Sequence, residues 1–542
     1  METAVQRREA PAHDDASSQV TRYSIRSIAS QWFSPKKPAS LESPESNEPR
    51  IGGVSATFLI FNRIMGTGVF ATPGVIMQLT GSAGLSLMLW LLGTFIAISG
   101  AAVYLEFGTA IPKNGGEKNY LEYVYSKPMF LTTAVYATYA MCLGWCSSNS
   151  VVFGEYILHA AHVPVGRWNQ RLIGLACLTT AFVIQSVNVN WGLRITNVLG
   201  VFKFAIVIVI IIGGCMALNG KLKIDQKPDN LSHPFRGSTP SAYGIVTALY
   251  SVVFSYIGYA NANYVLGETR NPEHTLKIAA SMAVSIAGVI YMLINVAYFA
   301  AVPREDIMNL EAGKSIAALF FKNVFGSRVE TSLSVFVALS AFGTVQAILF
   351  SQGRIVQELG RQGVLPYSRF FASNKPFNSP AAGLFEHYLI SSLIMLLPPP
   401  GDAFKFLLNV ISYPLSVINM LVSGGLLHIY MFPARYPSWS PKIRATWTLT
   451  VFFFLSNIYL VISPFIPPPT QAQNVYEHLP YYLHCVVALT MFLAGGVYWA
   501  VWAVLMPQIG GYSLCMEESV DEDGTTRMVV VKRMVEKERT TG

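Results

Sequence analysis

Long apolar stretches that contain almost no charge constrain this chain more than any other feature of its sequence. Charged residues make up 13% of the 542 residues, whereas hydrophobic residues make up 52%. An average soluble domain carries about 25% charged residues. A helix needs about 20 apolar residues to cross a bilayer, and most of these stretches reach that length. We therefore expect the chain to be embedded in a lipid bilayer.

Twelve stretches fit a membrane span, and the fourth and the ninth are the shortest. They cover residues 53–79, 83–110, 129–160, 171–188, 194–218, 241–266, 275–301, 329–356, 381–397, 403–430, 446–466 and 481–506. Within lipid every backbone amide needs an internal partner, so a span is either a helix or a strand of a closed barrel. Barrel strands would alternate apolar and polar residues, and runs such as 204–212 do not. The sequence predicts an all-α polytopic membrane protein with twelve transmembrane helices.

Polar segments flank this apolar region. Residues 1–50 are rich in Ser, Pro and charges of both signs, and they lack the apolar core of a signal peptide. We predict a disordered N-tail at 1–50, a transmembrane domain at 51–507 and a C-tail at 508–542. A cytosolic N-terminus places about 25 Lys and Arg on the cytosolic side and about ten on the other, which favours both termini in the cytosol. The net charge of +8 then reflects anchoring at the inner leaflet rather than nucleic-acid binding.

Other patterns concern modification and chemistry. The sequon at Asn230 lies in a loop that this topology places outside, so it predicts glycosylation there. The sequence contains neither H-E-x-x-H nor a Cys/His cluster nor a P-loop. We expect no metal, no cofactor and no enzymatic activity, because no nucleophile–base pattern lies in the spans.

Glycines interrupt two predicted spans near their centres. Gly66 and Gly68 lie in the first span, and Gly258 lies in the sixth among polar neighbours. Glycine weakens a helix, and a half-helix that begins after a break presents free N–H groups to a carboxylate. Close helix packing is the alternative explanation for such glycines. Two breaks at matching places favour a substrate site, as in transporters with inverted repeats.

Three segments resemble a known family. Residues 65–70 resemble the G-[ST]-G-[IV]-F motif of the amino acid–polyamine–organocation transporters, and residues 104–116 resemble E-[LF]-G-[TS]-x-x-P-[KR]-[SN]-G-G. Residues 268–272 resemble the E-x-x-N-P element that follows helix six. Within this superfamily the chain resembles the L-type amino acid transporters, and residues 104–125 and 143–156 resemble the fungal methionine permeases.

The resemblance implies a LeuT-type fold, a five-plus-five inverted repeat with helices 1 and 6 broken and two further helices. It also implies uptake of a neutral amino acid, methionine first, across a fungal plasma membrane. The substrate carboxylate would meet N–H groups of the first break, and the amino group would meet carbonyls of both breaks. Phe254 would be an aromatic gate, and Gly258 would leave space for the side chain. The residues assigned to the substrate are Ile64, Gly66, Thr67, Gly68, Phe254, Ser255, Tyr256 and Gly258.

Arg63 and Lys203 lie well inside predicted spans, where a charge is costly. The resemblance places the ammonium of Lys203 where sodium-dependent relatives hold a sodium ion, which implies sodium-independent transport. A buried lysine is able to exchange its proton, so our hypothesis is that Lys203 also couples transport to protons. A lysine that reaches back to the cytosolic interface is the alternative. Arg63 precedes the first break, and its pairing with Glu268 fits either an inner gate or a structural contact.

The tails leave further alternatives open. Lys36, Lys37, Lys532 and Lys537 fit the ubiquitin-dependent endocytosis of fungal permeases, and an inert tail fits as well. Residues 528–535 are apolar enough for a short strand or helix. A sensor that binds an amino acid without moving it is the alternative function, as is a carrier of a different neutral amino acid or a related metabolite.

Overall fold

The structure is a computed structural model of the chain. It describes residues 53–113, 115–224, 227–238, 241–261, 263–264, 272–310, 316–326, 330–399, 402–469, 474–520 and 526–534. Helices dominate these ranges, so the prediction of an all-α membrane protein is confirmed. The predicted N-tail, with Lys36 and Lys37, and also Glu268 and Lys537 lie outside the described residues.

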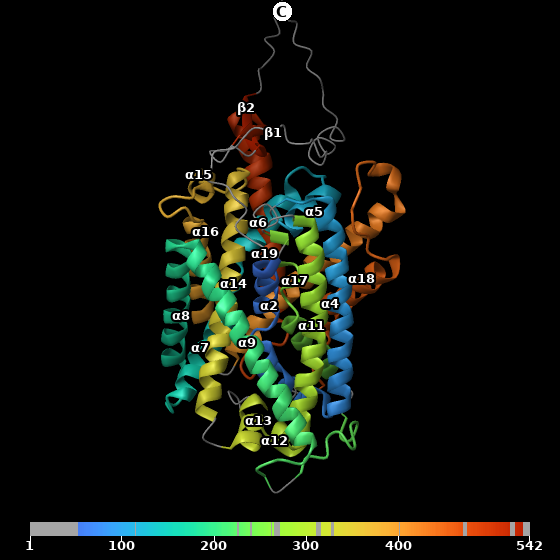
Figure 1. Ribbon diagram of the computed structural model, residues 1–542. Coiled ribbons are helices and arrows are strands. Elements are labelled where there is room, and N and C mark those ends of the chain that lie inside the picture. Colours follow the sequence, from blue (N-terminus) through green and yellow to red (C-terminus); the bar gives the residue numbers. More distant parts are fainter. Residues whose placement is uncertain are drawn as a thin grey trace, which may run out of the picture. The chain divides into compact units, whose positions relative to one another are not determined.

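Long apolar helices run side by side through the described part of the chain (Figure 1). Nine spans there are long and apolar enough to cross a membrane. The first of them is interrupted and consists of α2 (Gly53–Ile64) and α3 (Gly68–Thr80). The others are built on α4 (Ala83–Ala110), α8 (Arg167–Val187), α9 (Val189–Leu218), α11 (Pro272–Ala301), α14 (Glu330–Arg361), α17 (Ala403–Met431), α18 (Trp447–Ile462) and α19 (Leu483–Trp499).

Shorter elements complete the described part. Three are apolar helices of less than span length: α10 (Ala242–Ser255), α13 (Ile316–Phe325) and α16 (Ala381–Leu396). The small helices are α5 (Glu117–Val124), α12 (Arg304–Met308), α15 (Ser368–Ala372), η3 (Pro433–Arg435), η4 (Ser463–Phe465), the π-helix η6 (Ala500–Leu505) and α20 (Met506–Gly510). The count of twelve spans and the LeuT-type repeat stay predictions.

The third predicted span, 129–160, is not one helix. It consists of α6 (Leu131–Cys142) and α7 (Ser147–Ala160), separated by an extended residue, Leu143, and a turn. A Cβ on Gly144 would lie 2.5 Å from Oγ of Ser147, so the turn depends on a glycine there. The interruption buries the indole of Trp145, which is 4% exposed.

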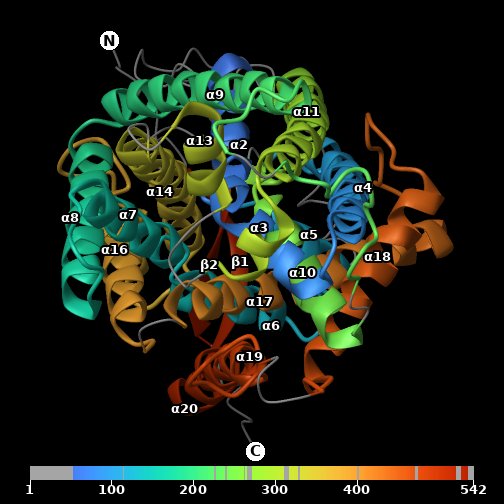
Figure 2. The same cartoon turned by 90° about the horizontal axis from the view of Figure 1, so that it is seen from below.

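The broken helix lies among the other spans rather than at their edge. Seen from below, α3 and α10 lie between α4, α14 and α17, and α2 lies beside α9 and α11 (Figure 2). In contrast, α9 exposes large apolar side chains such as Val198, Ile208 and Ile212. Exposed apolar surface on this scale fits contact with lipid.

The C-terminal residues form a hairpin of two antiparallel strands, β1 (Tyr512–Val520) and β2 (Thr526–Met534). The strand alternative for the segment at 528–535 is therefore the one observed, within the part that the structure describes. The N–H of Val530 donates a hydrogen bond to the carbonyl of Gln362, 2.9 Å away, next to the end of α14.

Candidate functional site

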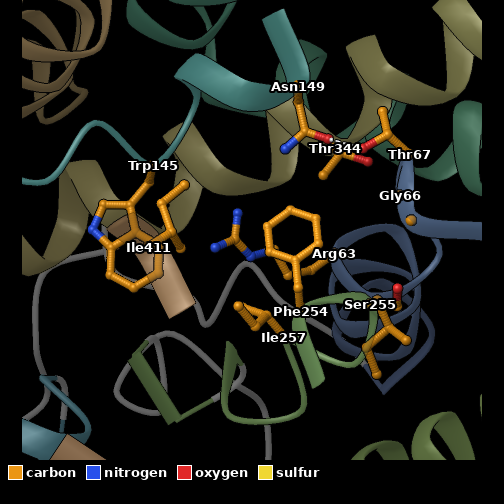
Figure 3. Close-up of a pocket in the computed structure, with 12 residues that line it drawn as sticks. Arg63, Gly66, Thr67, Trp145, Asn149, Phe254, Ser255, Ile257, Thr344 and Ile411 are labelled. Atoms are coloured by element: carbon orange, nitrogen blue, oxygen red, sulfur yellow. Dashed lines mark hydrogen bonds between the residues drawn. The ribbon is translucent and has the colours of Figure 1, made fainter. Parts of the chain in front are cut away.

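A pocket lies where the break between α2 and α3 meets the end of α10, the turn before α7, and the helices α14 and α17 (Figure 3). It contains six of the eight residues assigned to the substrate from the sequence. Its lining is Arg63, Ile64, Gly66, Thr67, Gly68, Trp145, Asn149, Phe254, Ser255, Ile257, Thr344 and Ile411.

The chain leaves the helical hydrogen-bond pattern between α2 and α3. The N–H of Gly66 donates to the carbonyl of Ile64, 2.8 Å away, so it is already used. The N–H groups of Thr67, Gly68 and Val69 meet no acceptor among the described residues. They stand at the N-terminus of α3, where backbone donors and the helix dipole favour a carboxylate.

Both glycines of this break lie against neighbouring helices. A Cβ on Gly66 would lie 3.1 Å from Oγ1 of Thr344, and one on Gly68 would lie 2.6 Å from Oγ of Ser255. The carbonyl of Gly68 also accepts the hydroxyl of Thr72 at 2.6 Å. Any side chain at Gly68 would therefore push α10 away from the free N–H groups.

A tyrosine that the sequence analysis did not single out lies between the two breaks. The hydroxyl of Tyr291, on α11, is 2.6 Å from the carbonyl oxygen of Ile64 and 2.8 Å from that of Ser255. A hydroxyl has one proton, so it donates to one of these carbonyls at a time. Two of the carbonyls assigned to the substrate's amino group thus face a common donor.

The assigned residues at and after the end of α10 lie in different surroundings. The ring of Phe254 is half-buried and meets the ring of Phe404 edge-on at a centroid distance of 6.4 Å. The hydroxyl of Tyr256 pairs with that of Thr94 at 2.6 Å, so this side chain packs on α4 rather than lining the pocket. Gly258 has a φ of +132°, a conformation that favours glycine.

Gly258 makes room for Arg63 rather than lining the pocket. A Cβ at this position would lie 2.3 Å from Cγ of Arg63. The guanidinium of Arg63 stacks over the Trp145 ring, 5.4 Å from its centroid. No ion pair joins Arg63 to a carboxylate of the described ranges, and its predicted partner Glu268 lies outside them.

Lys203 is 3% exposed and lies behind the first break. Its Nζ donates to the carbonyl of Asn62 at 3.0 Å and to Oγ1 of Thr344 at 2.9 Å. The ammonium therefore lies inside the protein, where α2, α9 and α14 meet, and does not reach back to the interface. Through Thr344 it is linked to Gly66.

Comparison with known proteins decides what kind of protein carries this pocket. The sequence pattern of the amino acid permease family matches residues 51–507. The chain belongs to the amino acid permease family. It is a multi-pass membrane protein that transports amino acids, and it is not an enzyme.

Individual relatives of this permease agree with the family. It is 48% identical to the high-affinity methionine permease of Saccharomyces cerevisiae, over 90% of this chain and 85% of that protein. It is 29% identical to the low-affinity methionine permease of the same yeast, over 92% and 90%. The human cystine/glutamate transporter is 28% identical over 75% of this chain and 79% of its own.

The predicted glycosylation of Asn230 does not fit the structure of the permease. The side chain is 5% exposed, and its amide nitrogen donates to the carbonyls of Phe299 and Val302 at 2.9 and 2.7 Å. A glycan on this nitrogen would require the loop to leave the protein. The sequon alone carries no information about this burial.

Five pocket residues were not assigned a role from the sequence: Trp145, Asn149, Ile257, Thr344 and Ile411. Trp145 and Asn149 lie in the stretch at 143–156 that carries the resemblance to fungal permeases. Thr344 and Ile411 lie in regular apolar helices, where nothing distinguishes them from packing residues. Within the described ranges, no group of three His, Cys, Asp or Glu side chains is placed to hold a metal.

Proposed function

We propose that this permease imports a neutral amino acid, methionine first, across the plasma membrane by secondary active transport. The observation that carries the proposal is the row of free N–H groups at Thr67, Gly68 and Val69, next to the end of α10. The 48% identity with a methionine permease supports the substrate.

In the proposed binding mode, the N-terminus of α3 binds the carboxylate of the substrate. The ammonium binds the carbonyls of Ile64 and Ser255 and takes over the place of the Tyr291 proton at one of them. Phe254 covers the bound amino acid and moves with α10. Each of these contacts uses a group common to all α-amino acids, so together they recognise the class.

We further propose that uptake is sodium-independent and coupled to protons through Lys203. An ammonium that binds the Asn62 carbonyl and Thr344 occupies the kind of oxygen site that a sodium ion needs. Loss of its proton would remove the charge that holds α9 to the first break. A change in charge at this point therefore couples the proton to the geometry of the carboxylate site.

The topology is proposed as the sequence analysis predicts it. Both termini face the cytosol, residues 51–507 form the transport domain, and 1–50 and 508–542 form the tails. The ends of α4 and α14 that carry α5 and α15 lie on the same side as the hairpin (Figure 1). This side carries the excess of basic residues, which fits the cytosol. The ubiquitin machinery is the proposed partner of the tail lysines.

Radiolabelled methionine uptake in a permease-deficient yeast tests the proposal. We expect saturable uptake that acidic medium stimulates and that replacement of sodium by choline does not change. Competition by all twenty amino acids defines the substrate class. If the protein reaches the plasma membrane and binds methionine but accumulates none of the twenty, the sensor function is correct instead.

A further inference from the structure

Arg63 presents a buried positive charge to the pocket. Its side chain is 9% exposed, and no carboxylate or carbonyl of the described residues accepts a hydrogen bond from its guanidinium. Among the described residues, the ionisable groups that interact electrostatically with it are Cys146, Tyr139, Tyr264 and His387, and none of them is a carboxylate. A buried cation is costly in any protein, and more so within a membrane.

The surrounding structure holds the guanidinium at one end of the pocket. Gly258 lacks a side chain where Arg63 passes, and the indole of Trp145 supports the guanidinium plane. Figure 3 shows the guanidinium turned away from Gly66 and toward Trp145 and Ile411. The carboxylate site and the buried cation therefore lie at different ends of one pocket.

The remaining lining at this end is mixed. Ile257 and Ile411 provide apolar contacts, and Trp145 provides an aromatic surface that a sulfur atom packs against favourably. The guanidinium adds hydrogen-bond donors and no acceptor. This combination fits an unbranched apolar side chain that ends near a hydrogen-bond acceptor. It disfavours a cationic side chain, because two positive charges would meet away from water.

We propose that Arg63 binds the far end of the substrate's side chain and selects neutral, unbranched side chains that carry an acceptor atom there. The thioether of methionine is such an acceptor, and the oxygen of methionine sulfoxide is a stronger one. The inference rests on the proposed function, because it assumes that the backbone of the amino acid occupies the N-terminus of α3. It assigns Arg63 a role in specificity in place of the inner gate.

Competition between methionine and norleucine tests this role, because norleucine replaces the sulfur with a methylene of similar size. For the wild type we expect norleucine to inhibit methionine uptake about tenfold more weakly, which corresponds to about 1.4 kcal/mol. The effect is at the low end for a hydrogen bond to a charged group because sulfur accepts weakly. Methionine sulfoxide should inhibit at least as well as methionine, and lysine should not inhibit.

The Arg63→Met variant keeps a long side chain and removes the charge. In this variant methionine and norleucine should inhibit methionine uptake about equally, so that the ratio of their inhibition falls from about ten to about one. The Arg63→Lys variant should keep most of the preference for methionine. A structural role would instead weaken both competitors together and leave the ratio near ten. That result, or equal inhibition by the two amino acids in the wild type, would overturn the proposal, as would glutamate inhibiting better than methionine.

The test also separates this inference from the proposed function. If the cells accumulate no methionine, transport is not the function, and the same ratio is then measured as ligand-induced thermal stabilisation of the purified full-length protein. If methionine and norleucine, at equal concentrations, raise the melting temperature of the wild-type protein by the same amount, the proposed role of Arg63 is wrong, whether or not the protein transports. If Arg63→Met does not reach the membrane, the proposal is tested by comparing inhibition by methionine and by norleucine in the wild type and in Arg63→Lys.

Discussion

The two interrupted helices of this permease contribute to the pocket in different ways. At the first break, α3 presents bare N–H groups, and no side chain takes part in the proposed carboxylate contact. At the second, the glycine with a positive φ accommodates a side chain that comes from the first. In the proposed binding mode, the first break recognises what all amino acids share, and the second permits the contact that distinguishes them. General and specific recognition are thus assigned to different breaks.

The largest effect is expected at the first break. Gly68→Val places a side chain on Ser255 and moves α10 off the carboxylate site, so uptake should fall about 100-fold at normal surface levels. Gly496→Val is the matched control, because a Cβ there would meet no atom within 4 Å. Normal methionine uptake by Gly68→Val would contradict the proposed carboxylate site.

The second break should respond more weakly. Gly258→Ala forces a strained φ and a contact with Arg63, and we expect a cost of about 2 kcal/mol and roughly 30-fold weaker methionine uptake. Gly511→Ala separates the two causes, because its φ is +64° and a Cβ there has open space. Combining Gly258→Ala with Arg63→Ala removes the contact, so the double variant should recover part of the thermal stability that Gly258→Ala loses. Strict additivity would show that the contact does not matter.

Lys203→Ala tests what lies behind the first break. It removes the donor to Asn62 and Thr344, so uptake should fall about tenfold and lose its dependence on external pH. Lys405→Ala, at an exposed position of α17, should change neither. Uptake measured between pH 5 and 8 in both variants decides, and a Lys203→Ala variant with the wild-type pH profile would rule out coupling through this lysine.

The smallest effect is expected where the breaks are joined. Tyr291→Phe removes the donor that Ile64 and Ser255 share and that the substrate ammonium replaces, so the KM for methionine should fall about fivefold, because the free protein alone loses about 1 kcal/mol. Tyr298→Phe, on the same helix, is the control, because the Tyr298 hydroxyl has no partner among the described residues. An equal change in KM for both variants would mean that the hydrogen bonds of Tyr291 to the two carbonyls do not affect substrate binding.

The sequence predicts the membrane spans and both glycine breaks, because apolar length and glycine within apolar runs are local properties. The predicted third span runs through the interruption at Leu143, although Gly144 and the polar residues at 147–150 follow it in the sequence, because the span is defined by apolar length alone. The sequence does not predict the contact of Gly258 with Arg63, since that contact joins segments almost two hundred residues apart. Tyr291 escapes notice for the same reason: within α11 it resembles any buried tyrosine.

The hydroxyl of Tyr291 has a consequence for how the empty pocket behaves. One phenolic proton cannot be donated to two carbonyls at once, so the carbonyls of Ser255 and Ile64 compete for it, although that of Ile64 also accepts the N–H of Gly66. An ammonium carries three protons and can serve both carbonyls together. In the proposed binding mode the substrate ends this competition, and the bound state is the one in which a single donor group ties α2 to α10.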